Sequence, residues 1–268
     1  MTRTPLAIAL LLVALAPLRG APSSGGAQEL PALEFHDLAA MTSWPLGRMQ
    51  TRGAMGQTAS FMVTELPPGL KTAPHHHHQE QMMLGLAGRM HYLMGDTPYP
   101  LPRLTAAIAL GNVHHGNIND TAEPAMCIEF QPVLRPDWYP PHPRRPREGL
   151  PEPIPIPAGR TVTESLDPSS GGAKQEARGV RSKSLAGDTL RLTVMELSAG
   201  GGSLALPGPG VERFVFVIDG KITIGSGSTR REISKDMLVI APPSAGTVRL
   251  SATTDASGLV AVYEPVAR

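Results

Sequence analysis

The sequence predicts an all-β fold of two tandem β-barrels joined by a proline-rich linker. Apolar runs of four to eight residues, such as 61–66, 190–197 and 213–219, alternate with turn residues, and many follow the two-residue period of a strand. Glycine and proline number 28 each, which suits tight turns between short strands. After the N-terminal segment, the sequence shows no amphipathic pattern long enough for a stable helix.

A proline-rich segment separates the two predicted barrels. Between Pro136 and Pro157, 22 residues contain nine prolines. Proline has no amide proton for a β-ladder and fixes its own backbone, so this segment forms neither a central strand nor a helix. We therefore expect an extended linker over 136–159, with one barrel over 34–135 and the other over 160–268.

The N-terminal residues have the pattern of a secretory signal peptide. Arg3 is followed by the apolar run 7–16 and then by the small-residue stretch 20–27, in the order of a charged region, a hydrophobic region and a cleavage zone. The apolar run is too short to span a bilayer. The sequence therefore predicts removal of 1–27 and a periplasmic or secreted protein without membrane contact after cleavage. An uncleaved N-terminal anchor is the alternative.

The overall charge and the cysteine content exclude several classes of function. The 24 basic and 23 acidic residues give a formal charge of +1, and no basic stripe is visible, so we expect no nucleic-acid partner. Cys127 is the only cysteine in the sequence, which excludes an intramolecular disulfide and a cysteine-based zinc site.

The two halves contain similar segments around one glycine each. Residues 85–90, Gly-Leu-Ala-Gly-Arg-Met, correspond to 217–222, Val-Ile-Asp-Gly-Lys-Ile. In both, an apolar strand ends at a glycine turn and a second strand follows. Counting outward from Gly88 and Gly220 aligns the flanking segments as well. A duplicated barrel is the simplest explanation of this repeat.

Histidines gather at two places in the first half. Side chains alternate between the two faces of a strand, so His75, His77 and Gln81 point the same way if their segment is extended. The residues at the intervening even-numbered positions then point the opposite way. His114 and His115 follow later in the chain, and a neighbouring strand can bring one of them to the first pair. Imidazole nitrogens are ligands for Zn, Fe, Cu, Ni and Mn, so we expect one metal site here.

Five positions in this region resemble the first sequence motif of the cupin superfamily. They are Gly69, His75, His77, Gln81 and Gly88. The segment from Gly111 to Asn119 resembles the second motif. The resemblance implies a jelly-roll barrel of the cupin type with one divalent transition metal, either Fe, Mn, Ni, Cu or Zn. The ligands that it implies are His75, His77, Gln81 and His115.

Two of these ligand positions have alternatives. His115 keeps the family's spacing to the end of the second motif, whereas His114 keeps the spacing to its start, and we expect His115 to be the ligand. Gln81 stands where the family usually has glutamate. Glu80 lies one position earlier with the opposite parity, and a local bulge would make it the ligand instead.

The second half resembles a cupin barrel that lacks metal ligands. Counted from Gly220, the ligand positions of the motif fall on Pro207, Pro209 and Arg213, and no histidine occurs in residues 160–268. We therefore interpret the chain as a bicupin with one metal site, in its first barrel. The second barrel is expected to be structural or to provide a binding surface.

The resemblance implies either an enzyme or a binding protein. In the first hypothesis, a small oxygenated substrate such as an enol, phenol, keto acid or sugar derivative chelates the metal through two oxygens. It then undergoes dioxygenase-type oxidation, isomerisation or elimination, with Glu80 or His91 as the catalytic base. In the second hypothesis, the protein captures a metabolite or a metal without turnover. Cupins often pair through sheet edges, so the resemblance implies a homodimer, or, as the alternative, two barrels of one chain that pair with each other.

Overall fold

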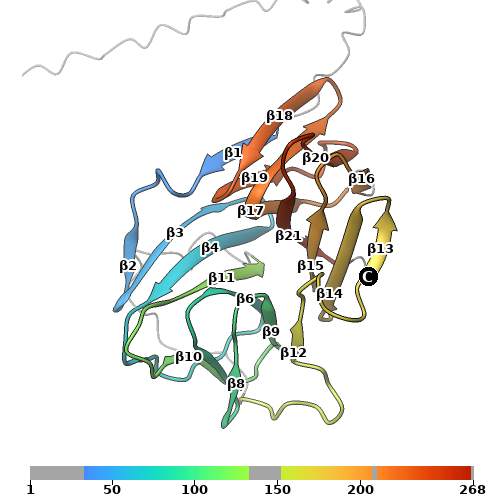
Figure 1. Cartoon of the computed structure of the whole chain (residues 1–268). Helices are drawn as coiled ribbons and strands as arrows, with labels where there is room; N and C mark the ends of the chain where they lie inside the picture. Colours follow the sequence, from blue (N-terminus) through green and yellow to red (C-terminus); the bar gives the residue numbers. More distant parts are fainter. Residues whose placement is uncertain (1–32, 133–151, 207–209, 267–268) are drawn as a thin grey trace, which may run out of the picture.

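The computed structural model describes residues 33–132, 152–206 and 210–266, and these residues form strands without any helix (Figure 1). The all-β prediction is therefore confirmed. The predicted signal peptide and most of the predicted linker lie outside the described residues. Within the described ranges, no helix is long and apolar enough to cross a membrane.

The first half forms two sheets. A seven-stranded sheet runs in the order β12-β9-β6-β11-β4-β3-β2, in which the edge strand β12 (Thr163–Ser165) comes from the second half of the chain. A four-stranded sheet runs in the order β5-β10-β7-β8. The strands of this half are β2 (Trp44–Leu46), β3 (Met49–Met55), β4 (Ala59–Leu66), β5 (Leu70–Lys71), β6 (Gln81–Ala87), β7 (His91–Met94), β8 (Thr97–Pro100), β9 (Thr105–Ala109), β10 (His115–Asn119) and β11 (Ala125–Pro132). Met83 and Cys127 from the larger sheet share one apolar core with Tyr92 and Met94 from the smaller sheet.

The second half contributes nine strands to a ten-stranded sheet that bends around a long strand. Its strands are β13 (Lys174–Ala177), β14 (Val180–Ala186), β15 (Leu190–Leu197), β16 (Ser203–Leu206), β17 (Arg213–Ser226), β18 (Thr229–Ser234), β19 (Met237–Ala241), β20 (Val248–Ala252) and β21 (Gly258–Pro265). The first part of β17 pairs with β19 and β21, and its second part pairs with β18 and β20. One continuous strand therefore joins both faces of this barrel.

Each half lends one strand to the other. β1 (Glu34–Asp37), which precedes the first barrel, pairs with β19 of the second, and β12 (Thr163–Ser165), which follows the linker, pairs with β9 of the first (Figure 1). β9 and β19 are separated along the chain by the same distance as Gly88 and Gly220. The exchange is thus reciprocal and occurs at equivalent edges. Sequence analysis does not predict it.

An apolar core lies between the two halves, in addition to the core of each barrel. Phe61 and Phe130 come from the first half, and Phe214 and Tyr263 come from the second. Ring centroids are 5.1 Å apart between Phe130 and Phe214 and 4.7 Å apart between Phe130 and Tyr263. These fully buried aromatic rings pack the seven-stranded sheet of the first half against the sheet of the second half.

A buried glutamate of the first half anchors a loop of the second half. The Glu80 carboxylate accepts hydrogen bonds from the backbone N–H of Asp188 at 2.8 Å and from the N–H and hydroxyl of Thr189, both at 2.7 Å. Arg160 lies 3.9 Å from the same carboxylate. Glu80 therefore faces the second half and not the interior of its own barrel.

A glutamate at the equivalent position of the second half makes the reciprocal contact. The Glu212 carboxylate accepts hydrogen bonds from the N–H of Gln57 at 2.7 Å, the N–H of Thr58 at 2.8 Å and the hydroxyl of Thr58 at 2.6 Å. Both receiving loops have the sequence Gly-x-Thr, and both glutamates directly precede a central strand. We call these two contacts the glutamate clamps. They support the duplication inferred from the sequence.

Candidate metal centre

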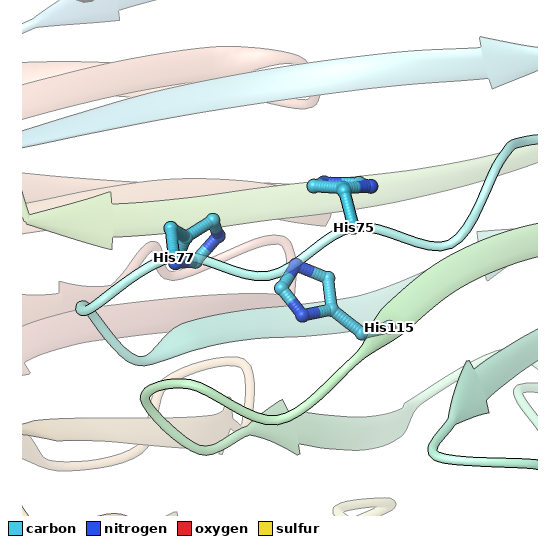
Figure 2. Close-up of side chains that lie close together, drawn as sticks. All are labelled: His75, His77 and His115. Carbon is cyan, nitrogen blue, oxygen red and sulfur yellow. The ribbon is translucent and has the colours of Figure 1, made fainter. Parts of the chain in front are cut away.

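Three histidines from two segments meet in the first half (Figure 2). His75 and His77 lie on the segment between β5 and β6, and His115 is the first residue of β10. Two backbone hydrogen bonds join the segments: His75 N–H donates to the His115 carbonyl at 3.0 Å, and His115 N–H donates to the His75 carbonyl at 2.8 Å. This local pairing places the imidazole rings beside one another.

The spacing of the three rings fits a single ion. One ring nitrogen from each of His75, His77 and His115 lies within 4.8 Å of the other two. A metal–nitrogen bond measures about 2.0–2.1 Å, so nitrogens that share an ion lie roughly 3–4 Å apart. His115 is buried, with 1% of its surface exposed, His77 is half-buried and His75 is exposed. The cluster therefore runs from the surface into the barrel.

Backbone carbonyls determine which nitrogen each ring presents. The Nδ1 atoms of His75, His77 and His115 lie 3.3, 2.8 and 2.9 Å from the carbonyl oxygens of residues 73, 79 and 113. A carbonyl oxygen only accepts, so each neutral ring carries its proton on Nδ1. The Nε2 lone pairs are then the ones available for an ion, as in metal sites where the second ring nitrogen is held by a carbonyl.

Burial also keeps the two inner rings neutral. Desolvation is the main cause that lowers the pKa of His77, and it lowers the pKa of His115 well below the ordinary value of 6.5. Neighbouring histidines lower the pKa of both rings further. The buried Nε2 of His115 has no hydrogen-bond partner among the described residues. A buried lone pair without a donor is costly, so the residues present fit a bound cation.

Gln81 extends the cluster toward the interior. It is the first residue of β6 and is buried, and its Oε1 lies 3.3 Å from Nε2 of His77. Its Nε2 donates to Oε2 of Glu129 at 3.2 Å. The predicted fourth ligand therefore lies beside the histidines with an oxygen directed toward them.

The alternative ligand Glu80 does not lie with the histidines, because its carboxylate forms the clamp described above. His114 is also separate: its ring contacts the ring of His76, with centroids 5.0 Å apart. His78 is exposed. The structure therefore brings together the four residues of the preferred ligand set and leaves both alternatives outside it.

His91, the other predicted catalytic residue, lies on β7 near the protein surface. Its Nδ1 is 3.7 Å from an oxygen of Asp120, and 34% of its side chain is exposed. The ring pairs with a surface carboxylate and not with any of the three clustered histidines. Neither predicted catalytic side chain is thus next to the candidate metal ligands.

Two polar groups that the sequence motifs do not mark, Glu129 and Tyr92, lie close to Gln81 and His115. Glu129 is 5% exposed, and burial raises the pKa of its carboxyl to about 7, although Thr64, Gln81 and Asn117 oppose the shift. The Tyr92 ring lies 5.9 Å from the His115 ring, and burial followed by the Glu129 charge raises the pKa of the phenol well above its usual value. A carboxylate in the apolar run 125–130 is the signal that marks this cluster in the sequence.

The second half has an ion pair where the first half has Gln81. Arg213, which is 4% exposed, lies with its Nε 3.0 Å from Oε2 of Glu264. Pro207 and Pro209, which align with His75 and His77, lie outside the described residues. Within the described part of the chain, the three histidines of the first half form the only group of this kind that can hold a metal ion.

The geometry defines a protein with a cupin-like fold and a three-histidine site, and comparisons with known proteins support this class. Residues 62–130 match the cupin domain model Cupin_2, and this span contains all four residues of the preferred ligand set. No curated protein matches the sequence significantly. The family match and the fold together support the cupin superfamily for the first half.

Solved structures share the fold over most of the chain. AerE from Microcystis aeruginosa has a TM-score of 0.61 at 17% identity, covering 84% of this chain and 96% of its own. The E. coli protein YlbA has a TM-score of 0.65 at 7% identity, covering 88% and 91%. A variant of Bacillus subtilis oxalate decarboxylase has a TM-score of 0.62 at 10% identity, covering 85% and 76%. At these identities the likeness is one of fold alone.

Proposed function

We propose that the protein binds one divalent transition metal ion through His75, His77 and His115, with Gln81 as the fourth ligand. The observation that carries this proposal is the orientation of the three rings. Each Nδ1 is engaged by a backbone carbonyl, and the ring nitrogens cluster within 4.8 Å. Fe, Mn, Ni, Cu and Zn all accept imidazole ligands, so the donor set supports this group of metals.

A small oxygenated substrate that chelates through two oxygens suits such a site best. Three neutral imidazoles and an amide leave the ion with its full 2+ charge, and a bound ion of this kind polarises substrate oxygens and acidifies bound water. Among the fold neighbours, the oxalate decarboxylase acts, by its name, on oxalate, which is a two-oxygen chelator. We propose a metal-dependent oxidoreductase of the dioxygenase type, or an isomerase or lyase.

Metal analysis with matched histidine variants tests the metal site. Wild-type protein is expected to bind about one equivalent of Mn²⁺, Fe²⁺, Co²⁺, Ni²⁺, Cu²⁺ or Zn²⁺. The substitution His115→Ala is expected to increase the dissociation constant of the metal at least about 100-fold. His78→Ala is the matched control, because His78 is exposed and outside the cluster. Titration calorimetry and elemental analysis measure both. Equal affinity of His115→Ala and wild type, or no binding by wild type, would contradict the proposal.

A non-catalytic metabolite- or metal-binding protein is the second candidate. It is favoured by one observation: Glu80 is held in an interdomain clamp and His91 pairs with Asp120, so neither predicted base lies at the cluster. Incubating the metal-loaded protein with oxalate, keto acids and catechols, while following product and oxygen uptake, separates the candidates. Turnover lost in His115→Ala supports the enzyme, whereas tight retention without product supports the binder.

Export and self-association complete the proposal. We propose that 1–27 direct secretion and are then removed, and that the mature protein forms a homodimer. N-terminal sequencing of the protein recovered outside the cytoplasm is expected to begin near residue 28. Sedimentation equilibrium of the mature protein measures its oligomeric state, and a monomer at micromolar concentration would contradict the dimer.

A further inference from the structure

We propose that Glu129 orients the side-chain amide of Gln81, so that Gln81 presents its carbonyl oxygen and not its NH₂ group to the metal. Glu129 is then a positioning residue of the site. This inference rests on the proposed metal site and specifies how its least usual ligand is held in place.

The Gln81 side-chain amide lies between the Glu129 carboxyl group and the His77 ring. Its Nε2 donates to Oε2 of Glu129 at 3.2 Å and also lies 3.6 Å from the sulfur of Met83. Its Oε1 lies 3.3 Å from Nε2 of His77. An ionised carboxylate only accepts hydrogen bonds, so with Glu129 deprotonated the NH₂ group belongs on the Glu129 side. Turning the amide over would place the Gln81 oxygen against the carboxylate.

The orientation that Glu129 imposes is unfavourable without a cation. Nδ1–H of His77 donates to the carbonyl of Gln79 at 2.8 Å, which leaves a lone pair on Nε2. This lone pair faces another acceptor, Oε1 of Gln81. On its own, the Gln81 amide gains a hydrogen bond by turning its NH₂ group toward His77. Glu129 opposes that rotation, and a metal ion satisfies both acceptors.

Glu129 is itself well fixed. It lies in β11, opposite Met83 of β6 and Met62 of β4, in the middle of the seven-stranded sheet. Its side chain is buried beside Thr64 and Asn117. A carboxyl group supplied by β11 thus lies beside the side chain that occupies the family's glutamate position. Its hydrogen bond with the Gln81 NH₂ group polarises the amide and makes the amide oxygen a better ligand.

A double-mutant cycle with Co²⁺ tests the inference. Glu129→Gln keeps the size of the side chain but accepts and donates equally well, so it no longer dictates the amide orientation. We expect this variant to bind Co²⁺ with a dissociation constant about tenfold higher than that of wild type, and to change the absorption spectrum of the bound Co²⁺. In a Gln81→Ala background the same substitution is expected to change the constant less than twofold. Glu65→Gln, which removes an exposed charge from β4, is the control and is expected to have no effect.

The outcomes separate this inference from the proposed function. Absence of Co²⁺ binding in the wild type overturns both. Binding by the wild type with an equal loss for Glu129→Gln in both backgrounds, or with no loss in either, overturns only the positioning role. If Glu129→Gln does not fold, the test is instead hydrogen exchange of the Gln81 side-chain NH₂ group, measured by NMR in ¹⁵N-labelled wild-type apoprotein. One proton protected from exchange is expected, and two freely exchanging protons overturn the inference.

Discussion

The central strands of the two barrels begin with the same residue type and then diverge. Glu80 and Glu212 each clamp a Gly-x-Thr loop of the other half. The residues that follow are Gln81, beside three histidines, and Arg213, in an ion pair with Glu264. At the start of these two strands, the residue that faces the neighbouring half is thus the same in both barrels, whereas the next residue, which turns away from it, differs. Docking of the halves constrains both barrels, whereas, within the described residues, only the first barrel has a histidine cluster that can hold a metal ion.

The largest expected effect on stability concerns the glutamate clamps, which both barrels have. Glu80→Ala and Glu212→Ala are each expected to lower the free energy of unfolding by about 3 kcal/mol, because two backbone N–H groups and a threonine hydroxyl lose their acceptor. Urea unfolding of the metal-free protein measures both losses. Glu65→Ala, at an exposed position, is the control. A loss at only one of the two sites would show that the clamps are not equivalent.

The next effect is a pH dependence of stability caused by Glu129 of the first barrel. The corresponding residue of the second barrel, Val262, does not titrate. Burial raises the pKa of Glu129 from 4.5 to about 7. The folded state thus binds an extra proton between these values, and the resulting stability is present below pH 4.5 and lost as the pH rises through 7.

Replacing Glu129 removes this dependence. In metal-free protein, the stability of Glu129→Gln relative to wild type is expected to increase by about 2.5 kcal/mol between pH 5 and pH 8. The lowered pKa values of His77 and His115 act with the opposite sign, but they are common to both proteins and cancel. Urea unfolding at both pH values measures the difference. A pH-independent difference would mean that the carboxyl titrates normally.

A smaller, matched effect is expected at the glycine turns that define the repeat. Gly88 and Gly220 have φ angles of +71° and +70°, which side chains of L-residues adopt only with strain. A Cβ atom would lie 2.5 Å from the Pro124 carbonyl oxygen in the first barrel and 2.0 Å from that of Ser257 in the second. Gly88→Ala and Gly220→Ala are each expected to cost about 2 kcal/mol in thermal or urea unfolding. Unequal losses would indicate that one turn relaxes.

The smallest effect is expected at His91. Its contact with Asp120 is long and solvent-exposed, so His91→Ala is expected to change the free energy of unfolding by less than about 0.5 kcal/mol. Metal affinity is expected to stay within twofold of wild type. If substrate turnover is observed and this variant abolishes it without changing metal affinity, the catalytic role predicted for His91 gains support.

Strands with an apolar pattern were predictable, and polar strands were not. The run 190–197 coincides with β15, and 213–219 forms the first part of β17. β13, with the sequence Lys-Gln-Glu-Ala, and β18, which begins Thr-Arg-Arg-Glu, are largely exposed and lack the alternation that marks a half-buried strand. Their place in the sheet follows from pairing with neighbours, which a local pattern does not contain.

Strand parity separated Gln81 from Glu80 but did not reveal what Glu80 contacts. Parity states which face of a strand a side chain occupies, and here the opposite face meets a loop more than 100 residues away in the chain. Likewise, the spacing of His75 and His77 indicates a metal site, but the carbonyls that fix their tautomers depend on local backbone turns. Long-range and backbone contacts of this kind arise only when the whole chain is assembled.

The exchanged strands β1 and β12 determine the order in which this chain completes its fold. During synthesis, the β9 edge of the first barrel stays unpaired until residues 163–165 emerge beyond the linker. The β19 edge of the second barrel, by contrast, has its partner from the outset, because β1 is made at the start of the described chain and stays unpaired until residues 237–241 are synthesised. Cleavage within the linker would therefore release two fragments, each with an open edge prone to pair with other chains and each carrying the strand that the other lacks.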